Sequence, residues 1–150
     1  MSDEEIAALI AEPKSYSGKA QTWRQKLGHA EMDFELNGGS GSEFILLLRK
    51  RLDDEGDFSV GIRWKRNGEE DVILLRMNGD HGGHRNPIEG TAFDGGAHVH
   101  RATARYIDAG KRAEHFAEPT AEYATWSEAL EHMLRTAHVT GVVVSVGLFS

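Results

Sequence analysis

Hydrophobic and polar residues alternate through several segments of this chain. From Ala30 to Leu36, each apolar residue is followed by an acidic one. Phe58–Arg66 alternates in the same way, and Asn67-Gly68 follows it as a strong hairpin signal before the apolar segment Glu69–Met77. Glu43–Arg51 is apolar on both faces, as in a central strand. These patterns predict consecutive strands of an antiparallel meander.

Two segments carry the signals of amphipathic helices. Ser2–Glu12 begins with an S-x-x-E capping box, has an apolar stripe and is followed by Pro13. Trp126–His138 follows a second capping box, Thr125 to Glu128, and places its apolar residues on one face. We therefore predict a helix near each end of the chain.

Two further segments complete the expected fold. His98–Ile107 is expected to begin as a strand, and the apolar Val142–Phe149 is expected to close the chain as another strand. The pattern predicts an α+β fold, with an antiparallel meander sheet of about five or six strands. The N-terminal and C-terminal helices are expected to pack on one face of this sheet. The 150 residues predict a single domain, 1–150.

Composition narrows the classes of function. The chain has no cysteine, which excludes disulfides and thiolate metal sites. Its formal net charge of -7 argues against broad non-specific binding to nucleic acid, although a local basic groove remains compatible. No apolar run approaches the roughly 20 residues of a membrane span, and the acidic N-terminus does not resemble a signal peptide. We therefore expect a cytoplasmic protein without a membrane partner.

The densest polar chemistry lies between Asn78 and His100. This stretch contains six glycines, which favour tight turns. Turns are expected at Asn86-Pro87 and at Asp94-Gly-Gly, and together they would fold one end of the loop back toward the other. His98 and His100 are two residues apart, so in a strand both side chains point to the same face. The side chains that the turns can bring together are Asp80, His81, His84, Arg85, His98, His100 and Arg101.

Three kinds of chemistry are compatible with this cluster. In the first, His81, His84, His98 and His100, with Asp80, hold a divalent metal such as zinc. In the second, His84, His98 and His100 perform acid–base catalysis without a metal, and Arg85 or Arg101 stabilises negative charge on a phosphate. In the third, the histidines only hydrogen-bond to the backbone.

These alternatives lead to two classes of function. A small phosphodiester-acting enzyme requires His84, His98 and His100 to converge in a cleft of positive potential. A non-catalytic binding module or homo-oligomer would pair through its apolar C-terminal strand, have histidines engaged by the backbone, and lack a cleft.

A family resemblance rests on the same residues. The run LRMNGDHGGHRNP, from Leu75 to Pro87, contains an H-x-N-P element and is followed by His98-Val-His100. It resembles a group of small uncharacterised bacterial proteins with H-x-N-P followed by P-H-x-H, although Ala97 replaces the proline here. More distantly, it resembles the TumE-type toxins of toxin–antitoxin pairs. The latter resemblance implies an activity directed at RNA and an antitoxin partner.

Overall fold

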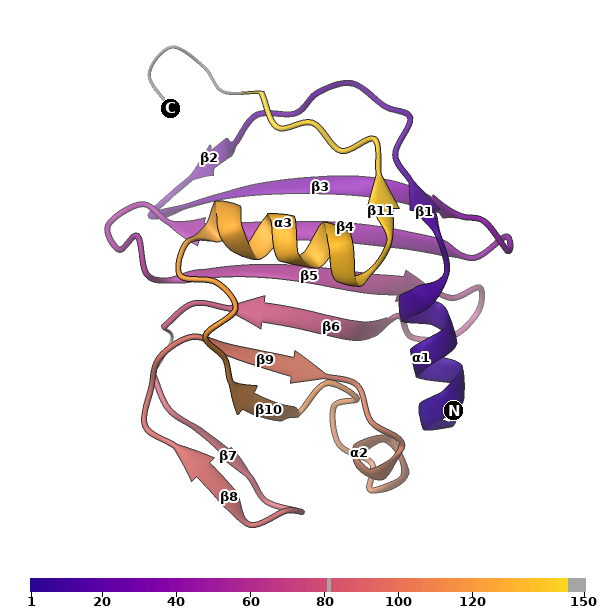
Figure 1. Ribbon diagram of the computed structural model, residues 1–150, viewed down its shortest axis with the longest axis vertical. Coiled ribbons are helices and arrows are strands. Elements are labelled where there is room, and N and C mark those ends of the chain that lie inside the picture. Colours follow the sequence, from indigo (N-terminus) through magenta and orange to yellow (C-terminus); the bar gives the residue numbers. More distant parts are fainter. Residues whose placement is uncertain (81, 146–150) are drawn as a thin grey trace.

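The fold is a large, mainly antiparallel sheet with helices on one face (Figure 1). The computed structural model describes residues 1–80 and 82–145. In that part of the chain, nine strands form the main sheet, in the order β10-β9-β6-β5-β4-β3-β1-β11, with β2 paired to β3. The strands of the main sheet are β1 (Lys14–Ser15), β2 (Arg24–Lys26), β3 (His29–Gly38), β4 (Glu43–Arg51), β5 (Phe58–Lys65), β6 (Val72–Asn78), β9 (His98–Arg101), β10 (Phe116–Pro119) and β11 (Val139–Thr140).

The predicted meander is confirmed by strands β3 to β6. Each pairs with the next in antiparallel register, for example Phe34 with Leu46 and Leu46 with Ile62. These three side chains are fully buried and belong to the hydrophobic core. Two of the acidic residues that alternate with the apolar ones on β3, Glu31 and Asp33, form ion pairs instead; Asp33 lies 2.7 Å from Arg49. Alternation therefore separates a buried face from a polar face.

Both predicted helices are confirmed, and both cover the same face of the sheet (Figure 1). Helix α1 (Asp3–Ala11) begins at the Ser2 capping box, and α3 (Trp126–Thr136) begins at the Thr125 capping box. The α3 side chains Leu130 and Met133 are buried in the core. The α+β prediction is therefore confirmed, with a larger sheet than the five or six strands expected.

The sheet exceeds the prediction because its additional strands are short. Strands β1, β2, β10 and β11 have two to four residues each, which is too few for an alternating pattern to be recognised. The segment expected to be a strand from His98 to Ile107 also changes structure midway. It begins as β9, and Thr103 then caps a short helix, α2 (Ala104–Asp108).

The expected strand Val142–Phe149 is wrong over its described part. The final strand, β11, pairs in parallel with β1 and ends before Gly141. Gly141 has a φ of 85°, which turns the chain out of the extended conformation. Between 142 and 145 there is only an isolated bridge, from Val144 to Gln21, and residues 146–149 lie outside the described residues.

A buried lysine joins the ends of the two covering helices. Lys14 is only 2 % exposed, and its Nζ donates to four backbone carbonyls at 2.8–2.9 Å. Burial lowers the pKa of Lys14 to about 8, so the side chain is still an ammonium at neutral pH. The acceptors lie near the end of α1 and at the end of α3; they are the carbonyl oxygens of Leu9, Ile10, Glu12 and Ala137.

Candidate functional site

Two of the predicted histidines lie on the sheet face opposite the helices. Val99, between them, packs against the core under the helices, so alternation turns His98 and His100 to the other face. Both are almost fully buried, at 3 % and 4 % exposed. On the neighbouring strand β6, Arg76 stands opposite His100 and Asn78 stands opposite His98. The sheet therefore places two imidazoles, a guanidinium and an amide on one patch.

The third histidine comes from a separate two-stranded hairpin, β7 (His84–Asn86) and β8 (Thr91–Phe93). The His84 ring centroid is 4.9 Å from that of His100 and 6.5 Å from that of His98. The His98 and His100 rings are 5.2 Å apart. The three imidazoles border a hollow of about 450 Å³, within the usual range for ligand sites. We call it the histidine hollow; its lining residues are Ser59, Arg76, Asn78, Gly83, His84, His98, His100 and Arg112.

One buried amide fixes the hairpin that carries His84. Asn86 is 3 % exposed, and its side chain accepts from the Ala117 N–H at 2.9 Å and donates to the Ala117 carbonyl at 2.7 Å. Ala117 belongs to the edge strand β10, whose outer backbone groups the asparagine thereby satisfies. The asparagine of the H-x-N-P element thus holds its histidine against the sheet.

Hydrogen bonds to the backbone set the tautomers of two imidazoles. Nδ1 of His98 is 3.0 Å from the Gly96 carbonyl oxygen, and Nδ1 of His100 is 2.9 Å from that of Glu114. A carbonyl only accepts, so each Nδ1 carries a proton and each neutral ring has its lone pair on Nε2. The Nε2 of His98 is 3.3 Å from the Asn78 amide nitrogen, which is a donor.

The electrostatics of the histidine hollow favour a neutral His100 and an anionic ligand. Burial, reinforced by the Arg76 guanidinium, lowers the pKa of His100 to about 3. Arg112 also borders the hollow. No carboxylate within residues 1–80 and 82–145 lines it, although Glu114 lies 3.5 Å from Arg112. In a protein of net charge -7, this surface is locally cationic.

The lowered pKa of His100 predicts that the wild-type protein loses stability in acid, and that the His100→Asn variant does not show this loss. Unfolded His100 gains a proton below about pH 6.5, whereas folded His100 stays neutral to about pH 3. The native state therefore loses stability as the pH falls through this window, by about 2 kcal/mol between pH 7 and pH 5. Asparagine retains a donor for the Glu114 carbonyl and does not titrate. Urea unfolding at both pH values measures the difference, and equal losses in both proteins would contradict the assignment.

Buried polar atoms without a hydrogen bond gather around the histidine hollow. Five such side-chain atoms occur in the described part of the chain, and three belong to residues that line the hollow. They are Arg76 Nε, Asn78 Oδ1 and His84 Nε2. An unsatisfied buried polar atom is costly, so native proteins keep few of them, often where a ligand binds.

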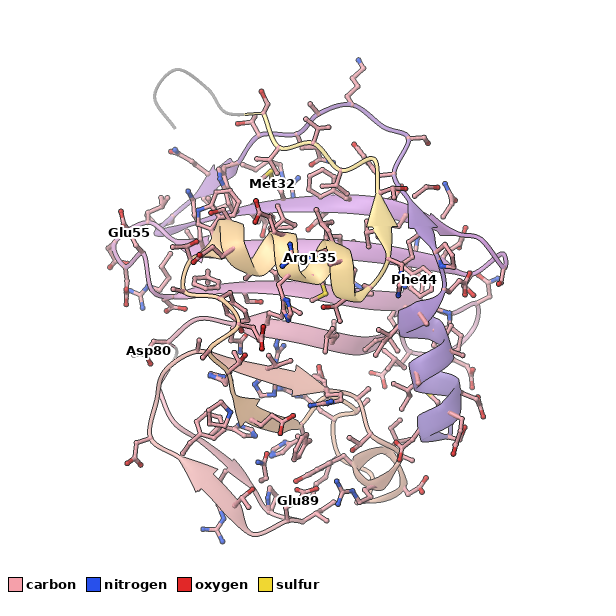
Figure 2. The ribbon with its side chains drawn as sticks, viewed as in Figure 1. Met32, Phe44, Glu55, Asp80, Glu89 and Arg135 are labelled. Atoms are coloured by element: carbon pink, nitrogen blue, oxygen red, sulfur yellow. The ribbon has the colours of Figure 1, made fainter. Side chains whose placement is uncertain are left out.

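The remaining predicted site residues lie elsewhere. Arg101 alternates with His100 and so faces the other way, where it pairs with Glu118. Arg85 is exposed on the hairpin and is not part of the hollow's lining. Asp80 lies where the chain leaves β6 (Figure 2), and its carboxylate accepts from two backbone N–H groups of the glycine-rich loops. His81 lies outside the described residues.

The geometry does not identify a metal site. Within residues 1–80 and 82–145, no group of three histidine or carboxylate side chains is arranged to hold a metal ion. The Arg76 guanidinium beside His100 also repels a divalent cation. The five-ligand site that includes His81 and Asp80 remains an untested prediction.

Sequence reasoning missed the residues that supply the charge. Arg76 and Asn78 end strand β6, where two polar side chains alternate with the buried Leu75 and Met77. Polar side chains on one face near the end of an apolar strand indicate a functional site, and this pattern is visible in the sequence of β6. Arg112 lies in a connection without periodicity, so no strand pattern places its side chain at the hollow.

No helix in the described part of the chain is long and apolar enough to cross a membrane.

The comparisons with known proteins identify a family. A model described as a family of unknown function (DUF6978) matches residues 1–139, a span that contains every residue lining the histidine hollow. Comparison with curated proteins finds no match, and neither does comparison with solved structures. The match covers most of the chain, and the protein therefore belongs to the family DUF6978.

Proposed function

We propose that the histidine hollow binds a phosphate diester of RNA and cleaves it by acid–base catalysis without a metal. The observation that carries the proposal is the grouping of three imidazoles and two guanidiniums around one hollow, which no carboxylate of the described residues lines. The unpaired Arg76 Nε–H is a donor without an acceptor, as a site for a phosphate oxygen requires.

His100 is the proposed general base. Its Nδ1 proton is held by the Glu114 carbonyl, so its Nε2 lone pair can take the proton of the ribose 2′-hydroxyl. Burial and, after it, the Arg76 guanidinium lower the pKa of His100. A phosphate anion bound by Arg76 offsets the guanidinium charge and so makes this imidazole more basic in the complex.

His84 is the proposed general acid. It approaches from the hairpin, its ring centroid lies 4.9 Å from that of His100, and its Nε2 has no hydrogen-bond partner. As the 2′-oxygen bonds to phosphorus, the bond from phosphorus to the 5′-oxygen breaks, and protonated His84 gives that oxygen a proton. The products are a 2′,3′-cyclic phosphate and a 5′-hydroxyl. Arg76 and Arg112 stabilise the charge on the non-bridging oxygens.

The test is cleavage of a fluorogenic RNA in EDTA by the wild-type protein and by two matched variants. Arg76→Met should lower kcat/KM roughly 10–100-fold, since it removes a charged hydrogen-bond donor from the phosphate. Arg101→Met should retain wild-type cleavage, because Arg101 faces away from the hollow. Loss of activity in EDTA would favour the metal alternative. A wild-type protein that cleaves no RNA, with or without EDTA, would contradict the proposal.

A non-catalytic binding module is the second candidate. It is supported by the Nδ1 atoms of His98 and His100, which bond to backbone carbonyls as that alternative requires. It also requires that no cleft be present, and the hollow of about 450 Å³ argues against it. A folded protein that neither cleaves RNA nor binds phosphate esters would favour this second candidate.

A further inference from the structure

A second, mainly apolar groove borders the hairpin next to the histidine hollow. It has a volume of about 290 Å³, at the small end of ligand pockets, and is bounded by β7, β8 and the edge strand β10. Its size suits one flat ring better than a whole nucleotide or a peptide. Glu89 and Phe93 both line this groove.

Phe93 connects the groove to the histidine hollow. Its ring centroid is 5.8 Å from that of His84 and 5.2 Å from that of His98. Because Phe93 also lines the groove, one face of the hairpin contributes to both cavities. A ligand whose charged group occupies the hollow can therefore extend an adjoining ring along Phe93 into the groove.

Glu89 gives the groove a polar wall. It lies at the turn of the hairpin (Figure 2), where its Oε1 accepts from the buried Tyr106 hydroxyl at 2.6 Å. Its Oε2 is buried and has no hydrogen bond, although Arg105 Nη2 lies 2.9 Å away as an ion-pair partner. That approach is close but lacks hydrogen-bond geometry, so Oε2 keeps its capacity to accept. With the three atoms at the hollow, four of the five unsatisfied buried atoms in the described chain belong to residues lining these two cavities.

We infer that the groove is a subsite for a nucleobase adjoining the phosphate held in the histidine hollow. The inference rests on the proposed function and adds the part of the substrate that the hollow does not bind. The base packs against Phe93, which supplies an aromatic surface for stacking. Its exocyclic amino group donates to Glu89 Oε2, so adenine, cytosine and guanine bind better than uracil, which has no amino group.

The experiment compares ligands with and without a base. Isothermal titration measures binding of inorganic phosphate, ribose 5-phosphate, cytidine 3′-monophosphate and uridine 3′-monophosphate. The cytidine nucleotide should bind at least about tenfold more tightly than ribose 5-phosphate, as expected for one stacked base. Phe93→Leu should remove this advantage and leave the affinity for inorganic phosphate unchanged. Glu89→Gln should remove the preference for cytidine over uridine.

The outcomes separate the two proposals. Equal affinities for cytidine 3′-monophosphate and ribose 5-phosphate would overturn the base subsite and leave the phosphate site intact. Failure of all four ligands to bind, together with no RNA cleavage, would overturn the proposed function and the subsite with it. Phe93→Met is the second variant if Phe93→Leu does not fold, because methionine keeps a long apolar side chain in the groove but has no aromatic face.

Discussion

Replacing His100 by asparagine is expected to lower RNA cleavage roughly 1,000-fold while the protein stays folded. Loss of a positioned general base typically lowers the rate by roughly 10²–10⁴-fold, and the expected loss lies within this range. Asparagine retains an N–H close to the place of Nδ1, and so preserves the bond to the Glu114 carbonyl. It lacks the Nε2 lone pair, which is the atom that the proposed mechanism uses. The measurement is single-turnover cleavage of a fluorogenic RNA in EDTA, with the melting temperature recorded for both proteins.

The matched control is His29→Asn. His29 also lies in a strand, β3, and also directs Nδ1 at a backbone carbonyl, that of Leu27, at 3.2 Å. It is exposed and does not line the histidine hollow, so its substitution should leave cleavage within twofold of wild type. If His100→Asn cleaves RNA as fast as His29→Asn does, His100 is not the base, and the mechanism is wrong.

The sequence predicted the sheet part of the site because strand alternation is a local property. His98 and His100 are two residues apart on one strand, and their common face follows from the geometry of any β-strand. The same rule excludes Arg101, which is adjacent to His100 and must face the other way. The prediction that Arg101 contacts phosphate therefore relied on closeness in sequence where alternation already argued against it.

The charged part of the site could not be placed from the sequence, because it depends on pairing between distant segments. Arg76 and His100 are opposite each other only because β6 and β9 pair in that register, and a shift by one residue would separate them. His84 depends on a separate hairpin, docked through the bonds between Asn86 and Ala117. The glycines predicted that the chain turns back, but not which side chains it would bring together.

One face of the sheet therefore contributes to stability, and the other contributes the proposed chemistry. The face under α1 and α3 carries the apolar core, and the opposite face carries the histidine hollow. The Asn86 amide holds the hairpin that carries His84 to the edge of the sheet by two hydrogen bonds to Ala117. Substitutions in the hollow should thus lower activity more than stability. Substitutions at Lys14, between the ends of α1 and α3, should lower stability more than activity.

Lys14→Met is expected to destabilise the protein by about 4 kcal/mol and to leave the hollow's chemistry unchanged in the folded fraction. The Lys14 ammonium binds carbonyls at the ends of both α1 and α3, and its Nζ lies 4.6 Å from the centre of the Phe44 ring. Methionine fills a similar volume but cannot donate, so the buried carbonyls lose their partner at about 1–3 kcal/mol each where water does not reach them. The nearby Glu12 carboxylate also loses a favourable charge.

Lys19→Met is the control for the removal of a lysine charge. Lys19 lies five residues further along the same connection and is exposed, so its substitution should change stability by less than about 0.5 kcal/mol. Urea unfolding at pH 7, where Lys14 is charged, measures both variants against wild type. A Lys14→Met protein within about 1 kcal/mol of the Lys19→Met protein would mean that the four carbonyls are satisfied without the ammonium. The two helices would then be joined by apolar packing alone.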